Sequence, residues 1–193
     1  METERNLYII AGCNGAGKTT ASYTVLPQVL QVNEFVNADE IARGLSPFNP
    51  GAMAIKAGKL MLDRIAELLA AGVSFAIETT LSTRSYVTLV RKARESGYKV
   101  SILFFFLQDV ELAKQRVAER VAHGGHDIPA DVIERRYYAG LRNLFGLFTD
   151  EVDSWTIYNN SLPGRPEIAS GGRLTSIHIY DIDKYQNIRG YER

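Results

Sequence analysis

The sequence predicts an α/β fold in which a five-stranded parallel sheet is sandwiched between helices. Apolar, β-branched runs alternate along the chain with segments of helical period, the order expected when parallel strands are joined through crossover helices. The run 102–107 is wholly apolar, as in a strand buried on both faces of a parallel sheet. A glycine-rich loop follows the first strand, 7–11, and leads directly into a helix. These three observations predict the fold class.

Turn and cap residues mark the elements of the first half of the chain. Pro27 disturbs the helix after the glycine-rich loop, because proline lacks the N–H that an inner helical turn requires. Asn49 is placed as an N-cap and Pro50 as the first residue of a long helix, which Gly72 ends. The expected elements are strand 7–11, helix 19–26, strand 34–39, a helical turn at 39–43, helix 52–71 and strand 73–77.

The second half continues the alternation and ends less regularly. Gly97 ends one helix, Asp109 caps the next, and Pro129 opens a third. The expected elements are helix 85–96, strand 98–107, helix 110–122, helix 129–148, strand 155–158, and a possible C-terminal β-hairpin of strands 167–169 and 176–180, joined by 170–172 before a short terminal helix.

Length and composition predict one domain over residues 1–193, with a C-terminal extension at about 161–193. The chain has 22 basic and 22 acidic residues, so its net charge of zero argues against a nucleic-acid partner. The single cysteine, Cys13, excludes an internal disulfide and fits a reducing compartment. Because no apolar run is long enough to span a bilayer, we expect a cytoplasmic protein without a membrane partner.

The residues from Gly12 to Thr19 match the phosphate-loop motif G-x-x-x-x-G-K-S/T. Glycines let successive backbone N–H groups surround a phosphate, and the helix that follows directs its unpaired N–H groups at the same anion. Lys18 adds a mobile charge whose expected partner is the ligand, and the Thr19 hydroxyl is a candidate Mg²⁺ ligand. The motif predicts a P-loop NTPase or kinase fold that binds ATP and Mg²⁺. The expected phosphate contacts are Gly12, Asn14, Gly15, Ala16, Gly17, Lys18, Thr19 and Thr20.

Two acids, Asp39 and Glu78, follow the second and third expected strands. Because ligands of such sheets bind at the carboxyl ends of the strands, both acids are expected beside the phosphate loop. There they could supply a base for a substrate hydroxyl and a partner for Mg²⁺ or for the substrate. The alternative is structural, with Asp39 capping a helical turn and Glu78 as an exposed strand end.

Arginines flank a glycine-broken loop at about 116–137, which describes a mobile lid. Phosphoryl transfer needs cations over the transferring group, and arginine offers phosphate oxygens a planar fork. The alternative is a solvated helix face. His123 and His126 lie in this loop, but the chain has only one other histidine and so cannot complete a zinc site from these residues. The lid arginines are Arg116, Arg120, Arg135 and Arg136.

Together these features resemble the zeta-toxin family of P-loop kinases. The resemblance covers about residues 5–160 and implies a kinase that phosphorylates a UDP-linked N-acetyl amino sugar and is restrained by an antitoxin protein. The chain departs from the family in its shorter length and in its Gly-Gly-His lid. The residues that carry the resemblance are Gly12–Thr19, Val36–Asp39, Ile77–Thr80, the lid residues Arg120 to Tyr137, and Tyr158–Asn160.

Carried over position by position, the resemblance assigns a role to each matching residue. The implied catalytic residues are Asp39 as the base, Lys18, Arg120, and one of Arg135 and Arg136, with Arg136 preferred. The remaining expected nucleotide contacts are Arg120, Arg135 and Asn159, and the expected substrate contacts are Asp39, Glu78 and Thr80. Apart from the resemblance, Arg84 in the loop after the third strand is expected to offer a cation to a diphosphate sugar.

The sequence thus predicts an ATP- and Mg²⁺-dependent kinase acting on a small-molecule hydroxyl, with a UDP-linked amino sugar as the acceptor that the resemblance implies. Two other classes of protein stay open. A nucleic-acid or nucleoside kinase remains possible, and a kinase of nucleic-acid ends would show a basic groove and salt-steep binding. A nucleotide-binding regulatory module without transfer would need no base, so Asp39 distinguishes it from a kinase.

Overall fold

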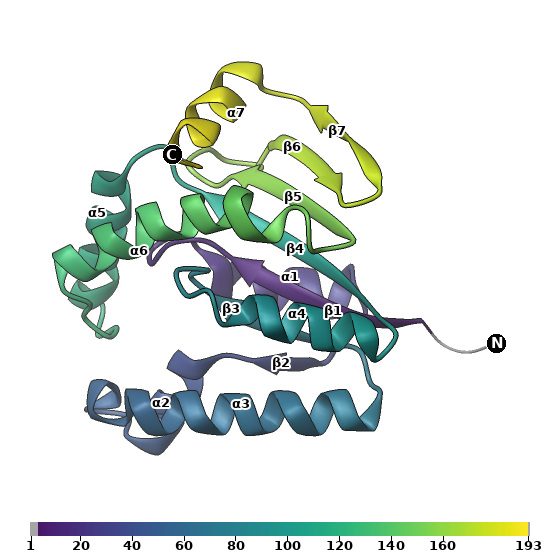
Figure 1. Cartoon of the computed structure of the whole chain (residues 1–193). Coiled ribbons are helices and arrows are strands. Elements are labelled where there is room, and N and C mark those ends of the chain that lie inside the picture. The colour runs from purple at the N-terminus through teal and green to yellow at the C-terminus, as the bar shows by residue number, and fades with distance from the viewer. Residues whose placement is uncertain (1–3, 193) are drawn as a thin grey trace.

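One seven-stranded sheet, in the order β2-β3-β1-β4-β5-β6-β7, forms the centre of the computed structural model, which describes residues 4–192 (Figure 1). Its first five strands are parallel, as the sequence predicts, and the predicted hairpin joins the same sheet as an antiparallel pair. Residues 1–3 and 193 of the predicted domain lie outside the described residues. The strands are β1 (Arg5–Ala11), β2 (Glu34–Val36), β3 (Phe75–Thr79), β4 (Tyr98–Phe106), β5 (Ser154–Asn159), β6 (Glu167–Gly172) and β7 (Thr175–Ile179).

Helices cover both faces of this sheet. In Figure 1, α4 and α6 lie in front of the strands, α1 lies behind them, and α2 and α3 lie beside β2. Within residues 4–192, no helix combines the length and the apolar character that a membrane crossing requires. The helices are α1 (Lys18–Gln28), α2 (Ala38–Leu45), α3 (Ala54–Ala71), α4 (Tyr86–Glu95), α5 (Val110–Ala122), α6 (Ala130–Asn143) and α7 (Ile182–Arg189), with short helical turns η1 (Pro50–Met53), η2 (Leu144–Phe148) and η3 (Gly190–Glu192).

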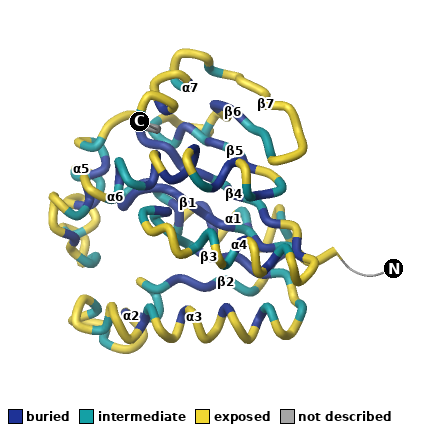
Figure 2. Tube along the Cα trace, viewed as in Figure 1, coloured by how far each residue is buried: buried dark blue, intermediate teal, exposed yellow. Residues whose placement is uncertain are grey.

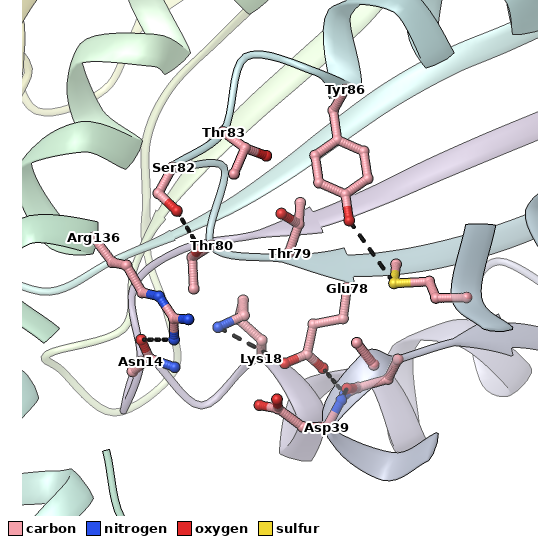
Figure 3. Close-up of a pocket in the computed structure, with 13 residues that line it drawn as sticks. Asn14, Lys18, Asp39, Glu78, Thr79, Thr80, Ser82, Thr83, Tyr86 and Arg136 are labelled. Atoms are coloured by element: carbon pink, nitrogen blue, oxygen red, sulfur yellow. Dashed lines mark hydrogen bonds and ion pairs between the residues drawn. The ribbon is translucent and has the colours of Figure 1, made fainter. Parts of the chain in front are cut away.

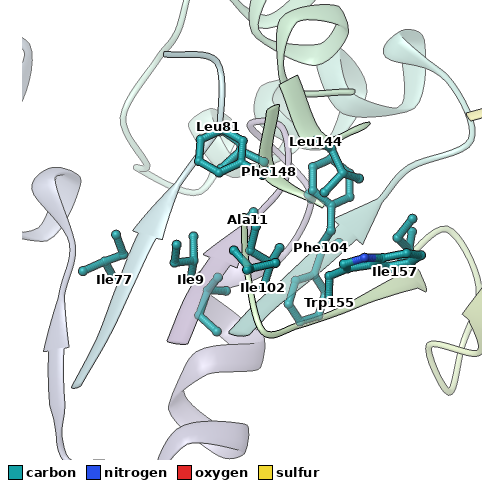
Figure 4. Packing of buried hydrophobic residues seen from close by; sticks show 14 of the residues in the cluster. Ile9, Ala11, Ile77, Leu81, Ile102, Phe104, Leu144, Phe148, Trp155 and Ile157 are labelled. Carbon is teal, nitrogen blue, oxygen red and sulfur yellow. The ribbon is translucent and has the colours of Figure 1, made fainter. Parts of the chain in front are cut away.

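A row of large apolar side chains crosses the sheet and sets the level of its strands. Ile9 of β1 aligns with Ile77 of β3 and with Ile102 of β4, which in turn aligns with Trp155 of β5 (Figure 4). All four are buried, and the buried positions concentrate on the strands (Figure 2). Burial of each such side chain contributes about 1.5–3 kcal/mol. The shared row therefore fixes the register and brings the carboxyl ends of the parallel strands to one edge.

The second strand is shorter than predicted, and the acid after it lies on a helix. β2 ends at Val36 because Asn37 caps α2, its Oδ1 accepting hydrogen bonds from the N–H groups of Asp39 at 2.8 Å and Glu40 at 3.4 Å. Asp39 therefore lies in the first turn of α2. The predicted single turn at 39–43 is in fact the eight-residue helix α2.

Two other predicted boundaries are wrong for local reasons. Pro50 opens the 3₁₀ turn η1, and Asn49 makes no side-chain cap, so α3 begins only at Ala54. The hairpin turns at 173–174 and not at 170–172, because Gly171 belongs to β6. A Cβ at Gly171 would lie 2.7 Å from Cζ2 of Trp155, so this glycine allows close packing of β6 on β5.

The C-terminal extension packs on η2, which directly follows α6. Tyr185 of α7 meets Phe145 of η2 edge to face at 5.9 Å, and Ile188 is fully buried. The Arg189 guanidinium lies 5.0 Å from the centre of the Phe145 ring, a cation–π contact. The extension is thus part of the same packed structure and is anchored on η2.

Candidate active site

The phosphate loop connects β1 to α1 at the carboxyl edge of the sheet. Gly12 and Gly17 have φ values of +142° and +75°, which side-chain-bearing residues rarely adopt. A Cβ at Gly12 would lie 2.5 Å from the carbonyl oxygen of Phe105, and one at Gly17 would lie 2.7 Å from Nδ2 of Asn160. Glycine at both positions therefore allows the positive φ values of the loop and its close approach to Phe105 and Asn160.

The Lys18 side chain is buried and contacts protein groups. Its Nζ donates a hydrogen bond to the carbonyl oxygen of Cys13 at 2.9 Å and lies 3.7 Å from Oε1 of Glu78. The expectation that its partner is only the ligand is therefore wrong for this conformation. Burial raises the pKa of the Cys13 thiol to about 11, so the thiol stays protonated at neutral pH and is a poor nucleophile.

Glu78, at the end of β3, joins the phosphate loop to the start of α2. Its carboxylate accepts hydrogen bonds from the Thr19 hydroxyl at 2.9 Å and from Nδ2 of Asn37 at 2.9 Å. Burial raises the pKa of Glu78, and Lys18 and Thr19 oppose that rise. The predicted structural alternative, an exposed strand end, is wrong, because the Glu78 side chain is only 10% exposed and its carboxylate contacts these polar partners.

Asp39 lies where two cavities meet. The smaller cavity has a volume of about 220 Å³ and the larger one about 410 Å³, and Ala38, Asp39 and Arg136 line both. Figure 3 shows Asp39, Lys18 and Arg136 around the same opening. The other residues of the smaller cavity are Asn14, Lys18, Asn37, Met61, Glu78, Thr79, Thr80, Ser82, Thr83 and Tyr86. The other residues of the larger cavity are Thr19, Tyr23, Glu40, Ala42, Arg43, Pro50, Gly51, Ala54, Arg120 and His126.

The predicted lid brings two of its arginines to this opening. Arg136 of α6 donates from Nη1 to Oδ1 of Asn14 at 3.3 Å. Arg120 of α5 lines the larger cavity and donates from Nη2 to the carbonyl oxygen of His126 at 2.7 Å. Arg135 is exposed and lines neither cavity. Of the two neighbouring arginines, the helix therefore directs Arg136 to the site.

Three further predicted residues lie away from the cavities. Thr20 and Arg84 are exposed and line neither one. Asn159 is buried beneath the loop that follows β5, where its Oδ1 accepts a hydrogen bond from the N–H of Ser161 at 3.1 Å. Its position is that of a structural residue.

Sequence reasoning missed two asparagines of the site. Nδ2 of Asn160 donates to the carbonyl oxygen of Ala16 at 2.5 Å, and Arg116 donates to the carbonyl oxygen of Asn160 at 3.0 Å. Asn160 thus ties the loop after β5 to the phosphate loop. Asn37 holds both Glu78 and the first turn of α2. Its signal was present, since an asparagine directly before an acidic helix start is a typical N-cap.

Comparison with known sequences gives a family model and two relatives. The model of the AAA domain family matches residues 7–141. An uncharacterized protein of Haemophilus influenzae is 30% identical over 126 residues, which are 65% of this chain and 88% of that protein. A nucleotide-binding protein of Fusobacterium nucleatum is 24% identical over 178 residues, which are 91% of this chain. The match spans only 55% of the Fusobacterium protein.

Solved structures share the fold. A chain of the AvrRxo1-ORF1–AvrRxo1-ORF2 complex with sulphate superposes with a TM-score of 0.77 at 15% identity, covering all of this chain and 66% of that one. The PezAT toxin–antitoxin system of Streptococcus pneumoniae gives 0.66 at 18% identity, over 88% and 72% of the two chains. A sugar kinase from Janibacter gives 0.54 at 25% identity, over 82% and 87%. The fold is the α/β fold of P-loop kinases.

Proposed function

The chain belongs to the AAA domain family, and on that premise we propose that it transfers the γ-phosphate of ATP to a hydroxyl of a small molecule. One observation carries the proposal. A carboxylate, Asp39, lines a cavity together with the phosphate-loop Lys18 and the lid residue Arg136. A protein that only binds a nucleotide has no use for a base at that point, whereas phosphoryl transfer needs one.

The residues divide the chemistry between them. Asp39 accepts the proton of the acceptor hydroxyl as that oxygen bonds to phosphorus, while the bond between the γ-phosphorus and the bridging oxygen breaks and ADP leaves. Lys18 neutralises charge on the phosphates, and Arg120 and Arg136 close over the transferring group from the lid. A crystal structure of the AvrRxo1 complex with ATP, which has a TM-score of 0.74 to this chain, supports ATP as the donor.

Thr19 and Glu78 fit a Mg²⁺ ion. A hydroxyl and a carboxylate already in contact at 2.9 Å at the mouth of the phosphate loop are oxygen donors of the kind that Mg²⁺ prefers. When bound, the ion would neutralise charge on the β- and γ-phosphates. Thr19 would be a direct ligand, and Glu78 would hold its hydroxyl in place.

The finer proposal concerns the acceptor, which we take to be a sugar hydroxyl. The resemblance to zeta toxins supports a UDP-linked N-acetyl amino sugar, and the sugar kinase of similar fold supports a free sugar. Two of the similar structures are complexes or systems of two proteins, which supports a partner protein such as an antitoxin for this chain as well.

Mass spectrometry of acceptors tests the proposal. The protein is incubated with ATP, Mg²⁺ and a panel of UDP-sugars, free monosaccharides, nucleosides and 5′-hydroxyl oligonucleotides. The proposal predicts a gain of one phosphate on a sugar. A gain on oligonucleotides alone would show a nucleic-acid kinase, and no gain on any member or on a cell extract would favour a binding module.

Replacement of the lid arginines should affect turnover more than ATP affinity. Arg120→Ala and Arg136→Ala each remove a cation that acts most strongly on the transition state, so we expect turnover to fall by about 10²-fold or more. Arg135→Ala is the matched control, because Arg135 is exposed on the same helix. Steady-state kinetics with ATP as the varied substrate measures all three variants. Equally mild effects of the three would favour the alternative that these arginines lie on a solvated helix face.

Glu78→Gln should change how stability depends on pH. Because burial raises the pKa of Glu78, the carboxyl contributes stability below its ordinary pKa of 4.5 and loses that contribution as the pH rises through the raised value. The glutamine variant does not titrate. Urea unfolding at several pH values should therefore show wild type losing stability relative to Glu78→Gln as the pH rises. An opposite slope of the difference would contradict the assigned environment.

A further inference from the structure

The loop between β3 and α4 places a set of hydroxyl groups on one wall of the smaller cavity. We call residues 79–83 the hydroxyl loop. Its threonines and serine line the smaller cavity, and the phenol of Tyr86, at the start of α4, lines it as well. Figure 3 shows Thr80, Ser82 and Tyr86 above Lys18 and Asp39, with Arg136 beside Thr80. The neutral hydroxyls thus share one cavity with the charged groups of Lys18, Asp39 and Arg136.

The hydroxyl loop is held in an unusual backbone conformation. Leu81 has a φ of +58°, in the left-handed region that branched side chains rarely adopt, and its side chain is fully buried in the hydrophobic core (Figure 4). Its N–H donates to Oγ1 of Thr79 at 3.0 Å, and its carbonyl oxygen accepts from Nδ2 of Asn143 at 2.8 Å. Strain of this kind persists where the surroundings hold it and concentrates at ligand sites.

Helix α6 supports the same loop from behind. A Cβ at Gly140 would lie 2.6 Å from the carbonyl oxygen of Thr80, so only glycine allows the helix to approach this closely. One helix therefore carries both the lid residue Arg136 and, at Gly140 and Asn143, the support of the hydroxyl loop. The loop is preorganised relative to the lid, as a specific binding site requires.

The partly buried hydroxyls of Thr80, Ser82 and Tyr86 line the cavity and retain capacity to bond a ligand. The hydroxyls of Thr80 and Ser82 lie 2.8 Å apart, so only one of them donates to the other and lone pairs and a proton remain. The Tyr86 hydroxyl donates to the sulfur of Met61 at 3.8 Å, a weak acceptor that a ligand oxygen would replace, and it also hydrogen-bonds with the side chain of Thr79. Groups that both donate and accept suit an acceptor that carries several hydroxyls.

The size of the cavity limits what enters it. Its volume of about 220 Å³ is below the roughly 300–1,000 Å³ of pockets that hold drug-sized ligands. The volume of a single sugar ring suits this cavity. A nucleotide sugar is larger, so the rest of it has to extend into the larger cavity of about 410 Å³ beyond Asp39. The larger cavity offers Tyr23 and Arg43 to such a continuation.

We propose that the hydroxyl loop and Tyr86 form the subsite for a monosaccharide-sized polyol ring, with Ser82 and Tyr86 as its specificity-determining residues. The proposal rests on the proposed kinase function, since the ring is the part that presents its hydroxyl to Asp39. The ring is shared by free sugars and nucleotide sugars. In a nucleotide sugar the remainder of the molecule lies in the larger cavity.

Kinetics of two variants test this subsite. Ser82→Ala and Tyr86→Phe each remove one hydroxyl, so we expect the KM for the sugar to rise by about 3- to 10-fold, the scale of one neutral hydrogen bond. The KM for ATP should stay within about twofold by the same scale. Thr88→Ala is the matched control, because Thr88 is exposed on the same helix as Tyr86 and lines neither cavity. For a deoxy sugar that lacks the hydroxyl bonded by Ser82 or Tyr86, the corresponding variant should raise the KM less than it does for the parent sugar.

Two further arms identify the source of the ring and separate this proposal from the kinase function. Tyr23→Ala and Arg43→Gln should raise the KM of a UDP-sugar and leave that of a free sugar unchanged. Saturation-transfer-difference NMR with the same sugars measures binding without turnover. Sugar binding that weakens in Ser82→Ala and Tyr86→Phe, without any phosphate transfer, would support the subsite and contradict the kinase function. Phosphate transfer with an unchanged sugar KM in Ser82→Ala and Tyr86→Phe would contradict the proposed subsite but not the kinase function. The same conclusion would follow if the KM for ATP rose as much as the KM for the sugar.

Discussion

Asp39→Asn is expected to lower turnover by about 10²-fold or more while ATP affinity stays near the wild-type value, which is the usual result of losing a general base. Asparagine has nearly the same shape but cannot accept the proton of the acceptor hydroxyl. The backbone N–H of residue 39 still donates to Asn37, so the first turn of α2 should remain in place. Isothermal titration calorimetry with a non-hydrolysable ATP analogue and steady-state kinetics with the true acceptor separate the two quantities.

Glu40→Gln is the matched control for this prediction. Glu40 follows Asp39 in the same helical turn, lines only the larger cavity and pairs with Arg43 at 3.3 Å. It should cost little turnover, because its partner is a half-exposed surface arginine. Equal turnover of Asp39→Asn and wild type would show that Asp39 is not the general base. Equal losses of turnover in Asp39→Asn and Glu40→Gln would indicate a general effect of the lost negative charge.

Lys18→Ala should abolish ATP-dependent activity and the stabilisation that ATP and Mg²⁺ give to the folded protein. The ammonium is the one phosphate-loop cation, and a ligand that binds the folded state raises Tm by an amount that grows with the logarithm of its concentration over Kd. The variant should also be less stable without ligand, because the buried Glu78 carboxylate loses the charge that lies 3.7 Å away.

The double variant Lys18→Ala with Glu78→Gln controls for that second effect, since it removes the uncompensated carboxylate together with the lysine. Thermal melts with and without ATP·Mg²⁺ measure both quantities. We expect the double variant to recover the lost Tm without ligand but to show no ATP-dependent shift. Equal ATP-dependent shifts in wild type and Lys18→Ala would contradict the assignment of the phosphate site.

Local signals predicted the phosphate loop and the parallel sheet because the physics of both is local. The glycines of the loop, the β-branched runs and the apolar core strand each determine their own conformation. The position of Asp39 was predicted at the correct edge of the sheet even though the strand ends at Val36, because the chain needs only a few residues to pass from strand to helix. The strand boundary failed because the cap at Asn37 was not weighed.

Features that depend on distant parts of the chain could not be predicted. Helical period alone does not say which of Arg135 and Arg136 faces the site, since that depends on how α6 packs on the sheet. The left-handed Leu81 is held by Asn143, which lies 62 positions away in the sequence. The preorganisation of the hydroxyl loop is therefore a tertiary property with no local sequence signal.

Phosphorus-31 NMR tests the central claim, that this site transfers phosphate and does not only bind it. The protein is mixed with ATP, Mg²⁺ and the sugar panel, and the γ-phosphate resonance is followed in wild type and in Asp39→Asn. We expect wild type to convert the γ-phosphate into a new phosphomonoester resonance in step with the appearance of ADP, and Asp39→Asn to do so more slowly by about 10²-fold or more. An ATP spectrum that does not change, or inorganic phosphate as the sole product, would contradict it.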